Sequence, residues 1–435
     1  MLAQFEIGAA AKNITPPLGT LLYGYPFERP AASVHDDLRV NAIAARQGDI
    51  SVILISADIC SIGDQLAEKV RRMIAEETGV LWENVIISAI HTHSGPSITN
   101  TAGWGVANDT YINEILIPQM LAASKEAVAG MVPAVMGIGN TNSNVGINRR
   151  ELTLEGEVIL GQNPYGMYDS EMTVLAFRSL EGKPIVNLIH YGCHPTSAGG
   201  NLEISRDWPG YMVDRMEHET GAMTVFFNGA EGDVGPRLSN GKTTGDMSYT
   251  QEVGSQAALD AIRAYKEVKE YRQVSLKSIS AEVKLPYKPM MNLEEAKRRI
   301  EVLGDPSTLI EVQIKEYASL CEIVKHYEER KETRTHMKFL QTLVAFNSVA
   351  IVPFPFELFV EISLRLKRYS PFENTLCLCN TNGAHAYLPS RDQMCRGGYE
   401  VAQFTSQKYS LVDNTDDVII NENMKLLKRL LQQGI

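Results

Sequence analysis

The sequence predicts an α/β fold in a single unit that spans residues 1–435. Short β-rich runs alternate with amphipathic segments up to about residue 287, which is the pattern of an α/β protein. A charged pair of helical segments follows, and no internal repeat, low-complexity tract or Ser/Pro linker divides the chain. Hydrophobic residues make up 44% of the sequence, which is enough for a packed core and excludes a disordered chain.

The strands are predicted first, from apolar β-rich runs of strand length. These runs are 40–46, 51–58, 84–90, 134–139, 173–178, 185–190 and 224–228. Helices are predicted where apolar residues recur at spacings of three and four. These segments are 62–78, 109–130, 209–220 and 245–270.

A helical hairpin is predicted as an insertion near 290–335. The segment NLEEAKRRIEVLG begins with Asn292 as a helix N-cap, has acidic residues in its first turn and ends in Gly. A second charged helix is predicted over roughly 309–335, and we interpret the charges as a solvated face rather than a binding surface. A strand at 337–352, a helix from about Glu357 and a strand at 375–379 complete the prediction.

The charge and the terminal sequence restrict the classes of partner. A net charge of −11 excludes the basic footprint of a nucleic-acid-binding protein and argues against docking on anionic lipid. The N-terminus does not read as a secretory signal, and no apolar run approaches the ~20 residues of a membrane span. We therefore expect a cytoplasmic protein with reduced cysteines, no stable membrane anchor and a small-molecule substrate. A homo-oligomer is left open.

Four of the nine histidines fall in two short segments that each follow an apolar strand. In an extended backbone, His91 and His93 would project from the same face, and Pro195 biases His194 away from helix. Neutral imidazole is a common zinc ligand, and a catalytic zinc needs about three protein ligands and an open position. The segments indicate a candidate metal site, although two histidines bonded within a turn would also explain HTH alone. We interpret His190, inside its strand, as a core histidine.

Each of four further residues could have a structural role or a functional role. Asp233 lies in a Gly-rich turn, where ordinary turn chemistry explains it. Arg149 could bind a carboxylate or a developing oxyanion, but could equally form a salt bridge. Glu357 stands where an apolar strand gives way to a helix and could be a first-turn residue, and Tyr387 could be a loop packing residue.

A set of stretches recurs in a recognisable order and spacing along the chain. They are GAAAKNITPPLG, SADI, IHTHSGPS, GINRRE, HPTSAGG, RDWPGYM, FNGAEGDVGPR, PFELFVEISLRLK and NGAHAYLPSRDQMCRGGYE. In these stretches the chain resembles the N-terminal catalytic domain of the neutral/alkaline non-lysosomal ceramidase family. HTHSGP and the NG…GDV…P loop, when they occur in one sequence, are specific for this family.

The resemblance implies a zinc hydrolase that cleaves an N-acyl amide and has a core of two β-sheets flanked by helices. The zinc ligands that it implies are His91, His194, Glu357 and Tyr387. It also implies that His93 is an active-site partner and that Arg149 is the active-site arginine. The family loop usually reads GDVSP, with a serine that lines the site, whereas this chain has Gly235. Known members are also longer, carry an Ig-like domain and are secreted or membrane-associated, so we expect a substrate other than membrane ceramide.

The hypothesis is metal-assisted amide hydrolysis. Zn²⁺ would activate water, Arg149 would stabilise the oxyanion and His93 would transfer a proton to the leaving group. Asp233 is the first candidate to orient the ligand histidines, ahead of Asp58 and Asp207.

Two alternatives remain at this stage. One is a zinc-dependent esterase or lactonase that acts on a small polar acyl compound. The other is a non-catalytic binding protein on a decayed hydrolase fold, against which four intact ligands argue. A serine hydrolase is disfavoured because the sequence has no GxSxG elbow.

Overall fold

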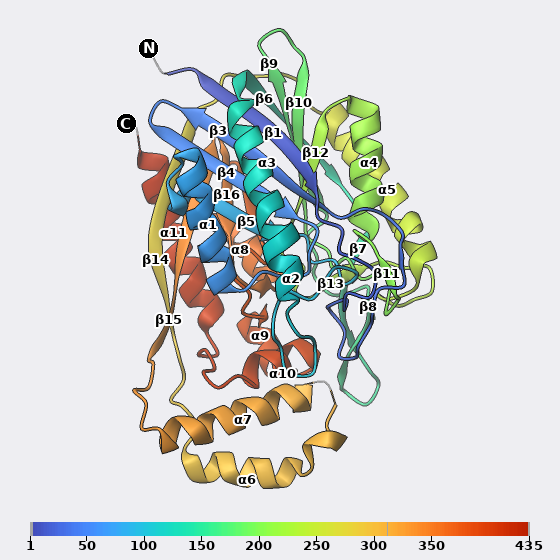
Figure 1. The fold of residues 1–435 in the computed structure, drawn as a ribbon, viewed down its shortest axis with the longest axis vertical. Helices are drawn as coiled ribbons and strands as arrows, with labels where there is room; N and C mark the ends of the chain where they lie inside the picture. Colours follow the sequence, from blue (N-terminus) through green and yellow to red (C-terminus); the bar gives the residue numbers. More distant parts are fainter. Residues whose placement is uncertain (1–2, 311, 434–435) are drawn as a thin grey trace.

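The computed structural model describes residues 3–310 and 312–433, which form helix, sheet, sheet and helix layers (Figure 1). An eight-stranded sheet and a four-stranded sheet face one another, and helices cover their outer faces. The predicted α/β fold with two sheets flanked by helices is therefore confirmed. Three smaller ribbons lie beside these layers.

The eight-stranded sheet has the strand order β12-β10-β9-β6-β1-β3-β4-β5. Its strands are β1 (Phe5–Asn13), β3 (Arg39–Gln47), β4 (Ile50–Ala57), β5 (Val85–Ala89), β6 (Val132–Asn142), β9 (Glu171–Ser179), β10 (Pro184–Tyr191) and β12 (Met223–Asn228). All seven strands predicted before residue 287 belong to this sheet. The eighth, β1, was not predicted, because FEIGAAAKN is rich in Ala and Gly, which are depleted in strands.

The two edges of this sheet meet. Ser56 Oγ donates a hydrogen bond to the carbonyl of Phe226 (2.6 Å), and Asn228 Nδ2 donates to the carbonyl of Ile90 (3.0 Å). Neighbouring strands twist by about 20–25°, so across this many strands the edges rotate by about half a turn. The carboxyl ends of β5 and β12 therefore lie together although the strands are far apart in the sheet order.

Helices cover the outer face of this sheet in two groups. The first is α1 (Asp64–Thr78) with α3 (Ile117–Ala129), and the second is α4 (Trp208–Thr220) with α5 (Met247–Lys266). The predicted helix 109–130 begins as α2 (Asp109–Tyr111) and passes through a π-helical turn at Ile112–Leu116 before α3. Pro118 has no backbone N–H to donate, which accounts for the change of hydrogen-bond register there.

The four-stranded sheet has the order β14-β15-β16-β18. Its strands are β14 (Leu276–Pro286), β15 (His336–Phe346), β16 (Val349–Pro353) and β18 (Asn374–Leu378), and α8 (Val360–Tyr369) and α11 (Thr415–Gln432) cover its outer face. The predicted strand 337–352 is two strands, because Asn347 adopts a left-handed conformation (φ 55°) and turns the chain. Aromatic side chains such as Phe5, Phe177 and Phe346 fill the space between the two sheets.

The smaller elements lie near the ends of the strands. They are β2 (Ser33–Val34), β7 (Gly146–Leu152), β8 (Val158–Asn163), β11 (Glu203–Ile204), β13 (Val234–Pro236), β17 (Glu357–Leu358), β19 (Tyr387–Leu388), α9 (Arg391–Met394) and α10 (Tyr399–Thr405). β13, β7 and β8 form one ribbon, and β17 pairs with β19 in another.

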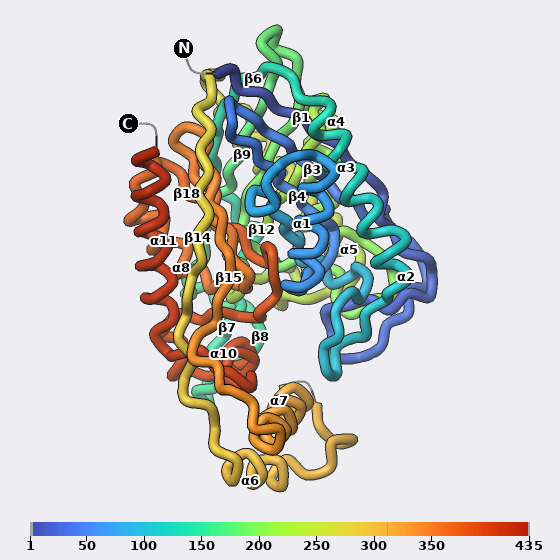
Figure 2. Tube along the Cα trace, turned by 60° about the vertical axis from the view of Figure 1, so that its left-hand side comes forward, coloured from blue at the N-terminus to red at the C-terminus, as the bar shows by residue number. Residues whose placement is uncertain are grey.

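The predicted helical hairpin is confirmed as α6 (Leu293–Leu303) and α7 (Val312–Glu328). It is inserted between β14 and β15, which pair from Leu276↔Phe346 to Pro286↔His336. The hairpin projects at one end of the molecule, where α7 lies closer to α10 than α6 does (Figure 2). Within the described ranges, no helix has the length and apolar character needed to cross a membrane.

Candidate metal centre

Three side chains from distant parts of the sequence meet beside a cavity that two of them, His91 and Glu357, line. His194 Nε2 lies 3.1 Å from Glu357 Oε2, and His91 Nε2 lies 3.4 Å from the same oxygen. Both imidazoles are buried, and only 8% of Glu357 is exposed. The three ligand atoms lie within 4.8 Å of one another. They are three of the four ligands that the family resemblance implies.

His91 reaches this position by leaving the strand, not by continuing it. β5 ends at Ala89, and His91 has a left-handed backbone (φ 73°), so the expectation that His91 and His93 share one face of an extended strand is wrong. The backbone N–H of His91 donates to the carbonyl of Ile59 (3.0 Å), which ties the turn to the end of the neighbouring β4 segment. The two rings still meet, with 3.3 Å between their Nε2 atoms.

Backbone carbonyls determine which nitrogen of each ligand histidine is free. Nδ1 of His91 donates to the carbonyl of Cys60 (2.7 Å), and Nδ1 of His194 donates to the carbonyl of Glu231 (2.6 Å). A carbonyl oxygen can only accept, so the proton of each neutral ring lies on Nδ1 and Nε2 keeps its lone pair. Such bonds from the second ring nitrogen are typical of metal-ligating histidines.

Glu357 and Tyr387 lie side by side because β17 pairs in parallel with β19 in the register Glu357↔Tyr387. The predicted helix starts later than expected, at Val360, and Glu357 is in the short strand before it. Burial alone would raise the pKa of Glu357, but His91 and His194 outweigh it and hold the pKa of this carboxyl well below its usual range. The carboxylate is therefore available as an anionic ligand.

The donor set fits zinc on geometric and electrostatic grounds. Atoms about 2.0–2.2 Å from a tetrahedral zinc lie about 3.3–3.6 Å from one another, close to the separations of Glu357 Oε2 from the two imidazoles. Burial lowers the pKa of His194 to about 3, so its Nε2 presents a lone pair to a carboxylate oxygen. A lone pair that faces an anionic oxygen is repelled by it unless a cation lies between the two.

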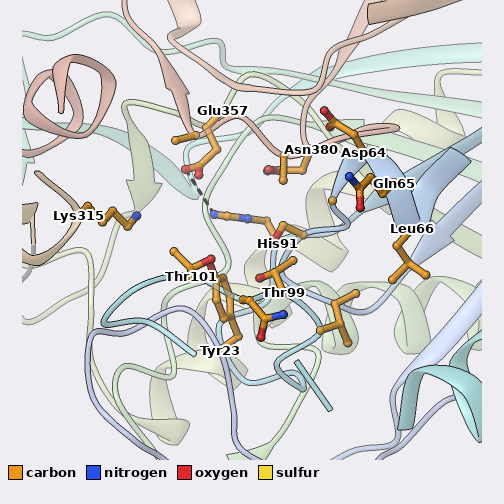
Figure 3. A pocket seen from close by; sticks show the side chains of 16 residues that line it. Tyr23, Asp64, Gln65, Leu66, His91, Thr99, Thr101, Lys315, Glu357 and Asn380 are labelled. Atoms are coloured by element: carbon orange, nitrogen blue, oxygen red, sulfur yellow. Dashed lines mark hydrogen bonds and ion pairs between the residues drawn. The ribbon is translucent and has the colours of Figure 1, made fainter. Parts of the chain in front are cut away.

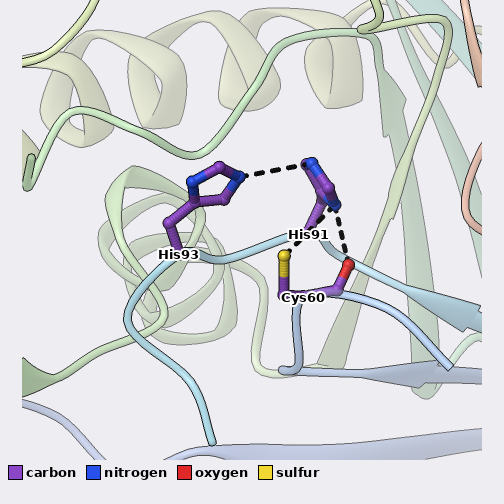
Figure 4. A group of neighbouring side chains, drawn as sticks. All are labelled: Cys60, His91 and His93. Atoms are coloured by element: carbon purple, nitrogen blue, oxygen red, sulfur yellow. Dashed lines mark hydrogen bonds between the residues drawn. The ribbon is translucent and has the colours of Figure 1, made fainter. Parts of the chain in front are cut away.

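A second group of potential ligands, Cys60 with His91 and His93, is less suitable. Figure 4 shows His93 beside one nitrogen of the His91 ring and Cys60 beside the other. The Nδ1 atom on the Cys60 side is already bonded to a carbonyl. One ion at His91 would therefore bind on the Nε2 side, which faces Glu357 and His93.

Arg149 is held beside Tyr387 by a buried carboxylate. Its Nε donates to Glu400 Oε1 (2.9 Å), and its Nη2 lies 3.0 Å from the Tyr387 hydroxyl. Burial would lower the pKa of Arg149, but Tyr387 and Glu400 outweigh it and raise that pKa above its ordinary value. Arg150 binds the other oxygen of Glu400 (2.6 Å), so one carboxylate serves two buried cations.

The carboxylate of Asp233 is bonded away from the ligand histidines. Its carboxylate accepts from the backbone N–H of Val360 (2.7 Å) and from Asn148 Nδ2 (3.2 Å), so it joins the ribbon at β13 to the start of α8. Asp207 likewise binds its own loop, at Ser197, Ala198 and Trp208. The assignment of Asp233 as an orienting residue is therefore not supported by its contacts. Backbone carbonyls, which leave no residue-specific signal in a sequence, do this instead.

Asp58, the third candidate, accepts from the backbone N–H of Arg39 (2.7 Å), and burial raises its pKa to about 7. The folded state keeps a proton that the unfolded chain releases near pH 4, so the free energy of unfolding should fall as pH rises from about 4 to about 7. We expect Asp58→Asn to be more stable than the wild type by about 1–3 kcal/mol at pH 8 and by much less at pH 5. Urea unfolding at both pH values measures this, and an equal effect at the two pH values would contradict it.

Gly235, where the family usually has serine, is explained by its neighbour. A Cβ at this position would lie 2.6 Å from Cβ of Thr243, so the space for a longer side chain is filled. Thr243 therefore fills the space that a side chain at position 235 would need.

A cavity of about 520 Å³ opens above the candidate ligands. Figure 3 shows His91 and Glu357 on one part of its wall, with Tyr23, Thr101 and Lys315 around them. Several residues around the centre were not predicted from the sequence: Cys60, Glu231, Asn380, Glu400 and Lys315. For Glu231 and Asn380, which share a hydrogen bond (2.6 Å), the only signal was a polar residue following a predicted strand.

Comparison with known proteins identifies the family of this chain. Residues 5–279 match the family described as neutral/alkaline non-lysosomal ceramidase, N-terminal. The chain is 26% identical to neutral ceramidase B of Dictyostelium discoideum over 276 residues, and 27% identical to neutral ceramidase of Pseudomonas aeruginosa over 273 residues. These alignments cover 57% and 58% of this chain but only 37% and 40% of the two relatives.

The fold is also similar to solved ceramidase structures. The crystal structure of neutral ceramidase from Pseudomonas aeruginosa superposes with a TM-score of 0.75 at 20% identity, covering 98% of this chain and 75% of that one. A structure described as ceramidase complexed with C2 gives the same TM-score at 17% identity, covering 98% of this chain and 76% of that one. From the match over residues 5–279, the chain belongs to the neutral/alkaline non-lysosomal ceramidase family.

Proposed function

We propose that this protein is a zinc-dependent hydrolase that cleaves an N-acyl amide. The observation that carries the proposal is the convergence of two imidazole Nε2 atoms and a carboxylate oxygen at one buried point. Membership of the ceramidase family supports the choice of an amide as the bond that is cleaved. His91, His194, Glu357 and Tyr387 would hold the metal.

The proposed unit is the whole of residues 1–435. His91 and His194 follow strands of the eight-stranded sheet, whereas Glu357 follows β16 of the four-stranded sheet. Neither sheet carries the ligand set alone. The proposed activity therefore requires both halves of the fold.

When bound at this centre, zinc would lower the pKa of a water from about 16 towards about 7 and polarise the scissile carbonyl. Arg149 would stabilise the negative charge that develops on the carbonyl oxygen, since Glu400 and Tyr387 hold its guanidinium in a fixed position. Burial and the neighbouring His91 hold the pKa of His93 well below its usual range, so the resting ring is neutral. His93 would move the proton between the attacking water and the leaving amine.

Hydrolysis of a matched panel tests the proposal. Purified protein loaded with zinc is assayed on amides, esters and lactones that share the same acyl groups. We expect cleavage of amides that disappears after chelation and returns with added zinc. If the protein cleaves lactones or esters but no amide, the proposed function is wrong and the protein is an esterase or a lactonase. Protein that binds no zinc would indicate a non-catalytic role.

Arg149→Met is expected to lower kcat by about 10²–10³-fold, because one fixed donor to the developing oxyanion is lost. The zinc should be retained, because Arg149 contacts only one of the four proposed ligands, Tyr387, and His91, His194 and Glu357 keep their positions. Steady-state kinetics and metal analysis on the same preparation measure both. Arg263→Met, at an exposed guanidinium on α5, serves as the control. An Arg149→Met enzyme with wild-type kcat would exclude this role.

A further inference from the structure

The inserted hairpin contributes a cation to the cavity of the candidate metal centre. Lys315, on α7, is the only lysine or arginine among the described residues that line the cavity. Figure 3 shows its ammonium group pointing into the cavity from the side opposite Asp64, with Glu357 and His91 between them. The charged hairpin is therefore not only the solvated face that the sequence indicates.

Two contacts hold Lys315 in place. Nζ donates a hydrogen bond to Gln403 Oε1 on α10 (2.7 Å) and lies 4.4 Å from the centre of the Trp104 ring. The preceding residue, Ile314, packs on the same loop, and a Cβ at Gly103 would lie 2.9 Å from its Cδ1. The ammonium group is thus fixed by three parts of the fold at the edge of the site.

This cation has no anionic partner of its own. In the part of the chain that the structure describes, its hydrogen bond and its ring contact are to Gln403 and Trp104, and the Glu357 carboxylate acts on it only through its charge. Of the two carboxylates that line the cavity, Asp64 is paired with His385 (2.8 Å) and Glu357 faces the two histidines. An ammonium group has three donors, and only one has a hydrogen-bond acceptor here.

Holding a lysine in this position has a cost that a ligand could offset. Burial lowers the pKa of Lys315 to about 8 and outweighs the opposite effect of Glu357 and Cys60. An anion entering the cavity would restore the lost solvation through a charge-assisted hydrogen bond. A neutral ligand could not, so the side chain is suited to recognise negative charge.

We propose that Lys315 makes this site selective for N-acyl amides that carry a carboxylate, such as an acyl group joined to the nitrogen of an amino acid. The carboxylate would bind Lys315 Nζ while the amide lies at the His91, His194 and Glu357 centre. The inference rests on the proposed function for the reaction, but the recognition of an anion by Lys315 can be tested without catalysis.

The kinetic test compares N-acylglycines with N-acylethanolamines of short, medium and long acyl chains. The two series differ in having a carboxylate or a hydroxymethyl group, and each has one amide. For the zinc-loaded wild type, we compare the best substrate of each series. We expect kcat/KM to be about 10- to 100-fold higher for the N-acylglycine than for the N-acylethanolamine, which is the effect of a hydrogen bond to a charged group. Lys315→Met should remove this ratio mainly through KM, and Lys315→Arg should retain it. Equal loss on both series, or no preference in the wild type, would overturn the proposal.

Binding separates this inference from the proposed function. Titration calorimetry of N-acylglycines into metal-free protein should give a Kd that Lys315→Met weakens by about 10-fold or more. Lys325→Met, at an exposed lysine of the same helix, is the matched control and should bind like the wild type. If neither series is hydrolysed but this difference in Kd is found, the proposed function fails and the anion site stands. An unchanged Kd in Lys315→Met would refute the anion site.

Discussion

Replacement of His194 by alanine is expected to release the zinc and to lower amide hydrolysis by more than about 10³-fold. His194 Nε2 faces Glu357 at 3.1 Å, and its Nδ1 is bonded to the carbonyl of Glu231. Alanine removes one ligand and leaves Glu357 with a single imidazole within ion-pair distance, His91. The affinity for zinc should fall because fewer protein donors remain to surround the ion.

His190→Ala is the matched control for this experiment. His190 is also a buried histidine at the end of β10, but its Nε2 is bonded to the carbonyl of Cys377 (2.9 Å) and not to the metal ligands. We expect this variant to be less stable but to retain zinc. Metal analysis by mass spectrometry and the rate of amide cleavage are measured on both. Zinc at full occupancy in His194→Ala would show that the ion binds elsewhere.

Glu400→Gln is expected to lower the free energy of unfolding by about 3–5 kcal/mol, the range for breaking a buried ion pair. Only 1% of Glu400 is exposed, and its two oxygens bind Arg149 and Arg150. Glutamine has nearly the same shape but no charge, and its amide group would direct N–H donors at a guanidinium. Two buried arginines would then share no anion, and Arg149 would lose the contact that positions it beside Tyr387.

Urea unfolding of the purified Glu400→Gln protein measures the loss of stability. The kcat of Glu400→Gln should also be lower than that of the wild type, as in Arg149→Met. Glu422→Gln on α11 is the control, because Glu422 pairs with Lys425 near the surface, where such a pair contributes about 1 kcal/mol or less. A Glu400→Gln protein as stable as Glu422→Gln would show that the buried cluster does not need its carboxylate.

Much of the fold could be predicted because the signals are local. The strands from β3 to β12 in the large sheet have runs of buried apolar residues, and α1 and α6 have one apolar face. β1 and the turn at Asn347 were missed, because small residues in a strand and a single left-handed residue carry weak patterns. Tertiary packing determines both of these features.

The candidate site was predicted less completely. The residue types of HTH and His194 pointed to a metal, and the family resemblance added Glu357 and Tyr387. The role expected for Asp233 does not agree with its contacts, and Glu400 and Lys315 were not identified. Their partners lie about 250 and 88 residues away in the sequence, so no local pattern could show them.

By itself, the sequence determined the α/β class, the inserted hairpin and the kinds of side chain available for chemistry, because periodicity and residue type are local properties. The tertiary structure decided which of these side chains meet. The coiling of the large sheet brings the ends of β5 and β12 together, and the β17–β19 register places Glu357 beside Tyr387. It also decided that backbone carbonyls orient the histidines and that a lysine from the hairpin reaches the cavity. These contacts join residues far apart in the chain, and only the packing of the whole fold brings them within bonding distance.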